Sequence, residues 1–197
     1  SDGTIAHGLG VRPAFLMIKQ RNESRNWMVF HKNYQDNYFT LNATDGAAGG
    51  YYGTGDDFDA NYTTTTLKWE GATTEVNKST GTYVCYAWAG VEGYSKFDSY
   101  EGTGSATNSP FIYTGFKPAL VMCKSAGTEN WIVVDDQRPG YNPTGNYLYW
   151  NLSNTEGGTG AQDEYIDLMS NGFKLRTTGA SANSSGVIYI YAAWAHH

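Results

Sequence analysis

Short apolar runs, each bounded by Gly, Pro or polar turn residues, recur along the whole chain. Residues 14–19 and 119–124 are apolar on both alternating faces, a pattern typical of interior β-strands that are covered on both sides. Residues 83–89 and 189–195 show the same two-sided apolar pattern. Because no window has a convincing helical period, we expect little helix.

The clearest turn signal is the dipeptide Asn171-Gly172, which lies between the apolar runs 165–169 and 173–175. Asn and Gly accept positive φ angles, so this pattern predicts a β-hairpin with a type I′ turn. A short helix over 161–169 is the competing interpretation of the same stretch.

Four sequence blocks occur twice, in the same order. Residues 12–19 return as 117–124, with a shift of 105 residues, and residues 83–89 return as 189–195, with a shift of 106. The other two pairs of blocks are 26–30 with 130–134 and 38–42 with 147–151. Such ordered repetition indicates two homologous copies of one β-unit, separated by loops of unequal length.

These patterns predict an all-β fold, a jelly-roll-like β-sandwich built from the two copies. We expect a first β-repeat over 1–90, a connecting extended segment over 91–108 and a second β-repeat over 109–195. Alternation of side-chain types within the connecting segment favours a strand over a flexible linker. We interpret 196–197 as the remnant of a purification tag and the start at Ser1 as a cut within a longer chain.

The repeated strands contain residues whose burial can be predicted. Four tryptophans are expected in the core because each lies in a repeated strand block: Trp27, Trp88, Trp131 and Trp194. Cys85 and Cys123 also lie in apolar runs, and we interpret them as buried free thiols. A disulfide between them would require Cα atoms within about 7 Å, which the sequence does not show.

Composition narrows the classes of function. The net charge is −6 and Lys and Arg form no cluster, which argues against nucleic acid and other polyanionic partners. No apolar run reaches the roughly 18 residues of a membrane span, so no membrane insertion is expected. The 16 Tyr and 6 Trp exceed what core filling usually requires. Such amphipathic rings suit half-exposed recognition surfaces, so this surplus favours a binding function.

Two blocks carry a family resemblance. The block His-Gly-Leu-Gly-Val-Arg-Pro at 7–13, with Tyr-Thr-Gly-Phe-Lys-Pro at 113–118, resembles a motif of bacteriophage tail-fibre and related virion proteins, in which a His-Gly-Leu-Gly-x-x-Pro turn introduces an apolar strand. The runs 91–97 and 191–195 resemble an uncharacterised domain family of phage structural and tail-fibre-like proteins, notably from marine phages. The resemblance covers nearly the whole chain.

That resemblance implies a place at the virion surface, outside cells. The implied partners are a host cell-surface glycan or other receptor, or other virion subunits, a homotrimer being one such assembly. It implies no catalytic residues. His7 is interpreted as part of the strand-entry turn rather than as a metal ligand or base, because Tyr113 stands at the corresponding place in the second block.

We predict that the protein is not an enzyme. Neither internal histidine, His7 or His31, lies in a nucleophile elbow, which argues against a serine or cysteine hydrolase. A polysaccharide-degrading glycosidase needs only two carboxylates about 5 to 9.5 Å apart and is the less favoured alternative. The acidic clusters that could supply such a pair, most of them flanking turns, are Asp56/Asp57/Asp59, Asp98/Glu101, Asp135/Asp136 and Asp163/Glu164/Asp167.

No cofactor is predicted, and calcium is the one metal to weigh. The alternating oxygen ligands Asp57, Asp59 and Asn61 echo the start of a calcium loop. Tyr62 and Lys68 stand where such a loop needs Gly and Glu, so a solvated acidic turn is favoured.

The predicted ligand site lies on loops that differ between the copies, because shared residues are explained by the scaffold. One loop spans 45–62 and the other spans 138–143. The candidate ligand-binding residues are Tyr51, Tyr52, Asp57, Asn61, Arg138 and Tyr141. Their rings would stack on sugars while the polar groups select hydroxyl geometry. The alternative is a structural or assembly domain, in which the rings cover the sandwich ends or contact a neighbouring virion subunit.

Overall fold

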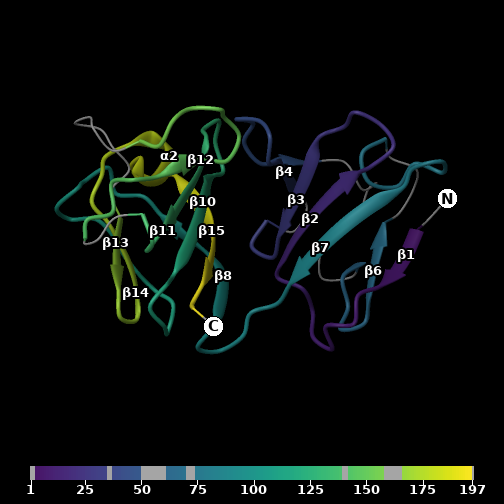
Figure 1. Ribbon diagram of the computed structural model, residues 1–197, viewed down its shortest axis with the longest axis horizontal. Helices are drawn as coiled ribbons and strands as arrows, with labels where there is room; N and C mark the ends of the chain where they lie inside the picture. The colour runs from purple at the N-terminus through teal and green to yellow at the C-terminus, as the bar shows by residue number, and fades with distance from the viewer. Residues whose placement is uncertain are drawn as a thin grey trace. The chain divides into compact units, whose positions relative to one another are not determined.

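Antiparallel β-strands form nearly all the regular structure of the computed structural model (Figure 1). The structure describes residues 3–34, 37–49, 61–69, 74–138, 142–157 and 166–196. The chain divides into unit 1, Ser1–Gly90, and unit 2, Val91–His197. The expected all-β fold is confirmed. In the described part of the chain, no helix is long and apolar enough to cross a membrane.

Unit 1 contains two antiparallel sheets. The larger has the strand order β5-β4-β3-β2-β7, and the smaller pairs β1 with β6. The strands are β1 (Gly3–Ala6), β2 (Phe15–Gln20), β3 (Trp27–His31), β4 (Asn37–Thr40), β5 (Ala48–Gly49), β6 (Thr66–Trp69) and β7 (Tyr83–Trp88). The core lies between the sheets, where Leu16 and Ile18 of β2 pack with Leu67 of β6. Unit 1 is therefore a small sandwich with its own core.

Unit 2 also contains two antiparallel sheets, ordered β12-β11-β10-β15-β8 and β13-β14-β9. The elements are β8 (Ser95–Glu101), β9 (Phe111–Tyr113), β10 (Leu120–Ser125), β11 (Trp131–Asp135), β12 (Leu148–Tyr149), β13 (Ile166–Met169), β14 (Gly172–Leu175), the short helix α2 (Ala180–Asn183) and β15 (Ile188–Trp194). Its core joins Tyr189 and Tyr191 of the larger sheet to Phe173 of the smaller one.

The pairing registers show that the units are structural repeats. Met17 of β2 pairs with Val29 and Tyr86, and Met122 of β10 pairs with Val133 and Ala192 at the same relative positions. The small sheets follow the same scheme, with Ile5 opposite Leu67 and Ile112 opposite Phe173. Among the described residues, β8 has no counterpart in unit 1, although it forms the edge of the larger sheet of unit 2. β8 lies within the connecting segment 91–108, where a strand was expected.

The turn that contains His7 has a structural role. The Nδ1 atom of His7 accepts the Leu9 N–H at 3.1 Å, and its Nε2 lies 3.2 Å from the Thr63 carbonyl oxygen. The strand registers align Ile5 with Ile112, so the counterpart of His7 is Thr114 rather than Tyr113. The Thr114 hydroxyl oxygen accepts the Phe116 N–H at 3.4 Å, just as His7 accepts the N–H of the residue two positions later. Gly8 and Gly10 have φ angles of 70° and 73°, which a side chain would strain.

The hairpin of β13 and β14 is present, but its predicted turn type is wrong. Met169 pairs with Gly172, so the loop residues are Ser170 and Asn171. No described residue other than glycine has positive φ, and Gly172 is not among the glycines that do. Gly172 instead starts β14, where an added Cβ would collide with the carbonyl oxygen of Ile112 in β9. Residues 166–169 form a strand rather than the competing helix; 161–165 lie outside the described residues.

Burial of the strand residues differs from the expectation in four cases. Trp131 is buried, with 1% exposure, but Trp27, Trp88 and Trp194 are only half-buried, so their predicted core position is wrong. All three lie at strand ends on the face turned away from the core between the sheets. Both cysteines are free; Cys123 is buried, whereas Cys85 is half-buried. Partial burial raises the pKa of Cys85 to about 11.

Candidate functional site

The structure describes two of the six predicted ligand-binding residues. Tyr51, Tyr52, Asp57 and Tyr141 lie outside the described residues. Asn61 belongs to unit 1 and is buried, with 8% exposure. Arg138 belongs to unit 2 and is exposed; its Nε–H donates to Asp135 Oδ2 at 2.6 Å, and its Nη1 lies 3.9 Å from Glu156 Oε1. Asn61 thus offers little surface to a ligand, and the charge of Arg138 is already shared with two carboxylates.

Acidic residues of two of the described clusters are engaged in ion pairs. Asp136 lies 2.9 Å from His196 and 3.7 Å from Lys117, and Asp167 accepts the Arg176 Nε–H at 2.5 Å. Burial acts to raise the pKa of Asp136, but hydrogen bonds from Gln137 and His196 outweigh it and lower that pKa. A glycosidase acid needs the opposite shift. Asp136 is therefore poorly suited to protonate a leaving group.

Metal binding has no candidate in the part of the chain that the structure describes. There, no group of three or more His, Cys, Asp or Glu side chains lies close enough to hold an ion. Asp57 and Asp59, which begin the calcium-like sequence, lie outside the described residues.

Three aromatic side chains form a row on the face of unit 1's larger sheet that is turned away from the core between its two sheets, which we call the outer face. We call Trp27, Tyr86 and Trp88 the aromatic row. The Trp27 and Tyr86 rings are 6.3 Å apart between centroids with an interplanar angle of 21°, and Tyr86 and Trp88 are 6.0 Å apart with an angle of 23°. Tyr86 is 46% exposed and both tryptophans are half-buried. Nearly parallel, partly exposed rings of this kind are a ready surface for stacking against a flat ligand.

Strand geometry explains how the row forms. Tyr86 and Trp88 are two residues apart on β7, so their side chains share one face of the sheet. Trp27 begins β3, and β2 lies between these strands, with Met17 paired to Tyr86 and Lys19 paired to Trp27. The row therefore extends from β3 to β7 across β2.

A pair of asparagines fixes the backbone at Trp27. The Asn42 side chain accepts the Trp27 N–H at 2.9 Å, and its amide donates to Asn26 Oδ1 at 3.0 Å. Unit 2 repeats this arrangement with Asn151, which accepts the Trp131 N–H at 3.0 Å. Because both units have it, the arrangement belongs to the shared scaffold.

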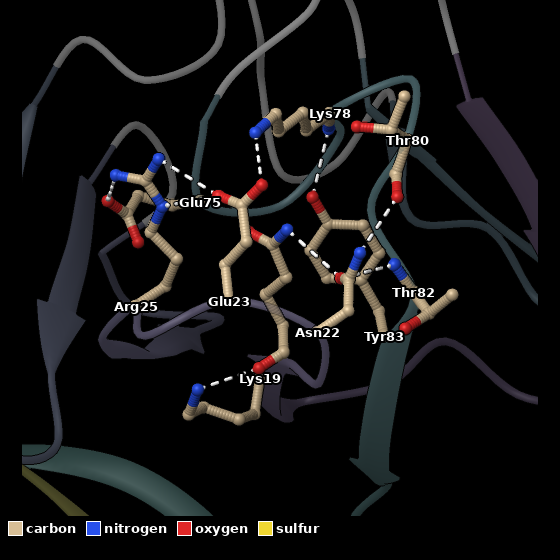
Figure 2. A network of polar contacts seen from close by, with 10 residues as sticks. Lys19, Asn22, Glu23, Arg25, Glu75, Lys78, Thr80, Thr82 and Tyr83 are labelled. Carbon is tan, nitrogen blue, oxygen red and sulfur yellow. Dashed lines mark hydrogen bonds and ion pairs between the residues drawn. The ribbon is translucent and has the colours of Figure 1, made fainter.

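Polar contacts hold the turn that precedes Trp27 (Figure 2). Figure 2 shows the Glu23 carboxylate between the side chains of Arg25 and Lys78; the Arg25 Nη2 atom lies 3.1 Å from Glu23 Oε2. Asn22 donates to the Thr80 carbonyl at 3.0 Å and accepts the Thr82 N–H at 3.0 Å. The hydrogen bonds from Lys78 and Arg25 lower the pKa of Glu23. These contacts tie the β2–β3 turn, which leads to Trp27, to the segment that precedes β7.

Lys19 adds a charged donor beside the row. It is half-buried and pairs with Trp27 in the strand register, and its Nζ donates to the Gln20 carbonyl at 2.7 Å. An ammonium group has three N–H donors, so this one bond leaves donors for a ligand hydroxyl or carboxylate. The outer face thus combines apolar rings with a polar donor.

Unit 2 does not repeat the aromatic row. Trp131 and Trp194 correspond to Trp27 and Trp88, but Ala192 stands where unit 1 has Tyr86. Trp194 instead contacts Phe97 of β8 edge-to-face, at 5.4 Å between centroids. Sequence reasoning missed the row because it assigned Trp27 and Trp88 to the shared scaffold. The exchange of Tyr86 for Ala192 inside a repeated block was the available signal.

Comparison with known proteins places the chain in a family. Residues 1–197 match the family described as Domain of unknown function (DUF7483). The chain belongs to the DUF7483 family. No curated protein and no solved structure matches it. A function for this DUF7483 domain therefore has to be argued from its own residues.

Proposed function

We propose that this domain is a non-catalytic recognition module that binds a surface glycan through the aromatic row of unit 1. The observation that carries the proposal is the half-exposed, nearly parallel set of Trp27, Tyr86 and Trp88. The C–H faces of a sugar ring are apolar and flat, so they stack on aromatic faces, while hydroxyls need nearby polar groups. Lys19 supplies such a group next to Trp27.

The setting that we propose is a tail-fibre-like protein at the virion surface, and it rests on the resemblance of residues 7–13 and 113–118 to the strand-entry motif. A host-surface glycan is the partner that fits both this setting and the aromatic row. The loops 45–62 and 138–143 remain a second candidate site for the same ligand class.

A structural or assembly role in the virion is the rival proposal. It is favoured by one observation: among the described residues, no strand pairs with the edge of β7 that is opposite to β2. The two roles make different demands on the aromatic row, because an assembly domain binds no sugar.

The test is a glycan array probed with the full chain and with Tyr86→Ala and Trp88→Ala variants. Loss of one stacking ring should weaken binding by about 1–3 kcal/mol, as at an interface hot spot. The melting temperature should change little in Tyr86→Ala, because that ring is 46% exposed. Trp150→Ala is the matched control, since Trp150 is 47% exposed in unit 2 and lies outside the row. An equal loss in the control, or a parent that binds no glycan, contradicts the proposal and favours the assembly role.

The same array separates the row from the loops. Tyr51→Ala and Tyr141→Ala variants should bind like the parent if the row is the site. If these two variants lose binding while the row variants keep it, the ligand binds at the loops instead.

A further inference from the structure

The edges of two corresponding strands, β7 and β15, differ. In unit 2, β15 pairs with β10 on one side and with β8 on the other, along seven residue pairs from Ile188 with Glu101 to Trp194 with Ser95. In unit 1, β7 pairs with β2, and no described strand pairs with its other side. We call that other side the open edge.

Backbone geometry identifies the groups that lie on the open edge. In an antiparallel pair, alternate residues direct both N–H and C=O toward the same neighbour. The Arg21 N–H donates to the Thr82 carbonyl at 2.7 Å, so Thr82 and every second residue after it face β2. Tyr83, Cys85 and Ala87 therefore direct their backbone groups toward the open edge. Their counterparts Tyr189, Tyr191 and Ala193 face β8.

Two hollows lie along the open edge, between β7 and β1. One has a volume of about 420 Å³ and extends to Trp88, and the other has a volume of about 170 Å³ and extends to Tyr83. Ile5 of β1 and Cys85 of β7 line both, so the hollows adjoin. We call them together the seam.

In unit 2, side chains of β8 occupy the corresponding space. Tyr100 stacks on Tyr189 at 5.2 Å between centroids, contacts Phe173 at 6.3 Å and donates its hydroxyl to the Ala182 carbonyl at 2.9 Å. Lys96 donates to the Tyr113 carbonyl of β9 at 2.7 Å. Thus β8 bridges the two sheets at the place where unit 1 has the seam.

The covering by β8 changes the burial of otherwise similar strands. Residues 189–193 of β15 are at most 2% exposed. Every residue of β7 is at least partly exposed, and Tyr86 reaches 46%. A strand that has apolar residues on both faces and an unpaired edge is a template for an added strand.

We propose that the open edge of β7 is a docking site for an extended peptide with the side-chain chemistry of β8. The peptide adds as an antiparallel edge strand and pairs with Tyr83, Cys85 and Ala87. It directs alternate charged and aromatic side chains into the seam, as Lys96, Asp98 and Tyr100 do in unit 2. Main-chain hydrogen bonds supply affinity, and the alternate side chains supply specificity. The paired groups lie on the open edge rather than on the aromatic row, although Tyr86 and Trp88 of the row also line the larger hollow.

The experiment adds a synthetic peptide with the sequence of residues 91–104 to the full chain. Two doubly N-methylated peptides form a matched pair. In the β8–β15 register, Lys96 and Asp98 direct their N–H groups toward β15, whereas Phe97 and Ser99 direct theirs away. N-methylation at Lys96 and Asp98 should abolish binding, and N-methylation at Phe97 and Ser99 should preserve it. A Tyr100→Ala peptide should bind about tenfold more weakly, because it leaves the seam unfilled.

Cys85 provides a built-in readout. Its alkylation by iodoacetamide should slow by about tenfold or more at saturating peptide, because alkylation then requires the added strand to open. Cys123, which is 1% exposed, serves as the unreactive internal reference. Amide hydrogen exchange should slow at Tyr83, Cys85 and Ala87.

Three outcomes overturn the proposal. The first is an unchanged Cys85 alkylation rate at saturating peptide. The second is equal binding of the two N-methylated peptides. The third is protection of Cys85 that rises with protein concentration alone, together with a doubled mass in light scattering, which makes a second copy of the chain the occupant.

Discussion

Units 1 and 2 have the same strand scheme, but corresponding strands differ in burial. β15 and β7 come from repeated blocks with similar apolar content. β15 pairs with β10 in the same register as β7 pairs with β2. β8 pairs along the second edge of β15, whose residues 189–193 are buried, whereas no described strand pairs along the second edge of β7, whose residues are all at least partly exposed. The environment of a strand is thus set by its neighbour in the sheet as much as by its own residues. The predictions below test this difference between the units.

The largest expected effect separates the two corresponding tryptophans. Trp131→Ala should destabilise unit 2 by about 3–5 kcal/mol, because it removes a fully buried ring and leaves a cavity. Trp27→Ala, the matched change in unit 1, should cost less than half as much, since Trp27 is half-buried. Urea unfolding followed by circular dichroism gives both free energies. Equal costs would mean that the two positions are equivalent despite their different exposure.

The next effect tests the role of β8. Tyr100→Ala should destabilise unit 2 by about 3 kcal/mol, because it removes the ring that stacks on Tyr189 and opens a hollow like the seam of unit 1. Ser99→Ala, on the opposite face of the same strand, is the control and should change the melting temperature little. Thermal unfolding of both variants measures the difference. Should the two variants melt alike, β8 would cover β15 without stabilising it.

The smallest effect concerns the contacts of Glu23 with Lys78 and Arg25 in unit 1. The pKa of Glu23 is lowered below its ordinary value of 4.5 by Lys78 and Arg25. A lowered folded-state pKa stabilises the fold above the ordinary pKa, and this contribution is lost as the pH falls below it. Exposed ion pairs contribute little, so a small effect is expected.

Glu23→Gln should therefore lower the melting temperature slightly at pH 7 and have no effect well below pH 4. Glu92→Gln, at an exposed turn of unit 2, is the control. Melting curves across this pH range decide the question. A Glu23→Gln effect that persists at low pH would show that the charge of Glu23 is not its cause.

The sequence predicted structure reliably where the signal was local. The strands at 14–19 and 119–124 were predicted because apolar runs between turn residues are a local signal. The half-burial of Trp88 was not predicted, because both faces of its strand are apolar and the pattern does not say which face is covered. The turn at Gly172 failed for a similar reason: the glycine serves the close approach of Ile112, a contact distant in sequence.

The candidate site was less predictable than the fold. Searching loops that differ between copies led to Tyr51 and Tyr141, which lie outside the described residues, while the aromatic row lies on strands. Tyr86 is the one member of the row that differs from its counterpart inside a repeated block. Comparing the copies residue by residue within the blocks, rather than only outside them, would have found it.

The pairing of β8 with β15 joins the first and last strands of unit 2, nearly a hundred residues apart in sequence. A nascent chain cannot complete this sheet until its last strand has left the ribosome, and loop closure over that distance is entropically costly. Unit 2 should therefore fold slowly, with β8 unpaired until β15 docks. The same pairing brings the unit's two chain ends side by side, which is the geometry that tolerates circular permutation and tandem repetition.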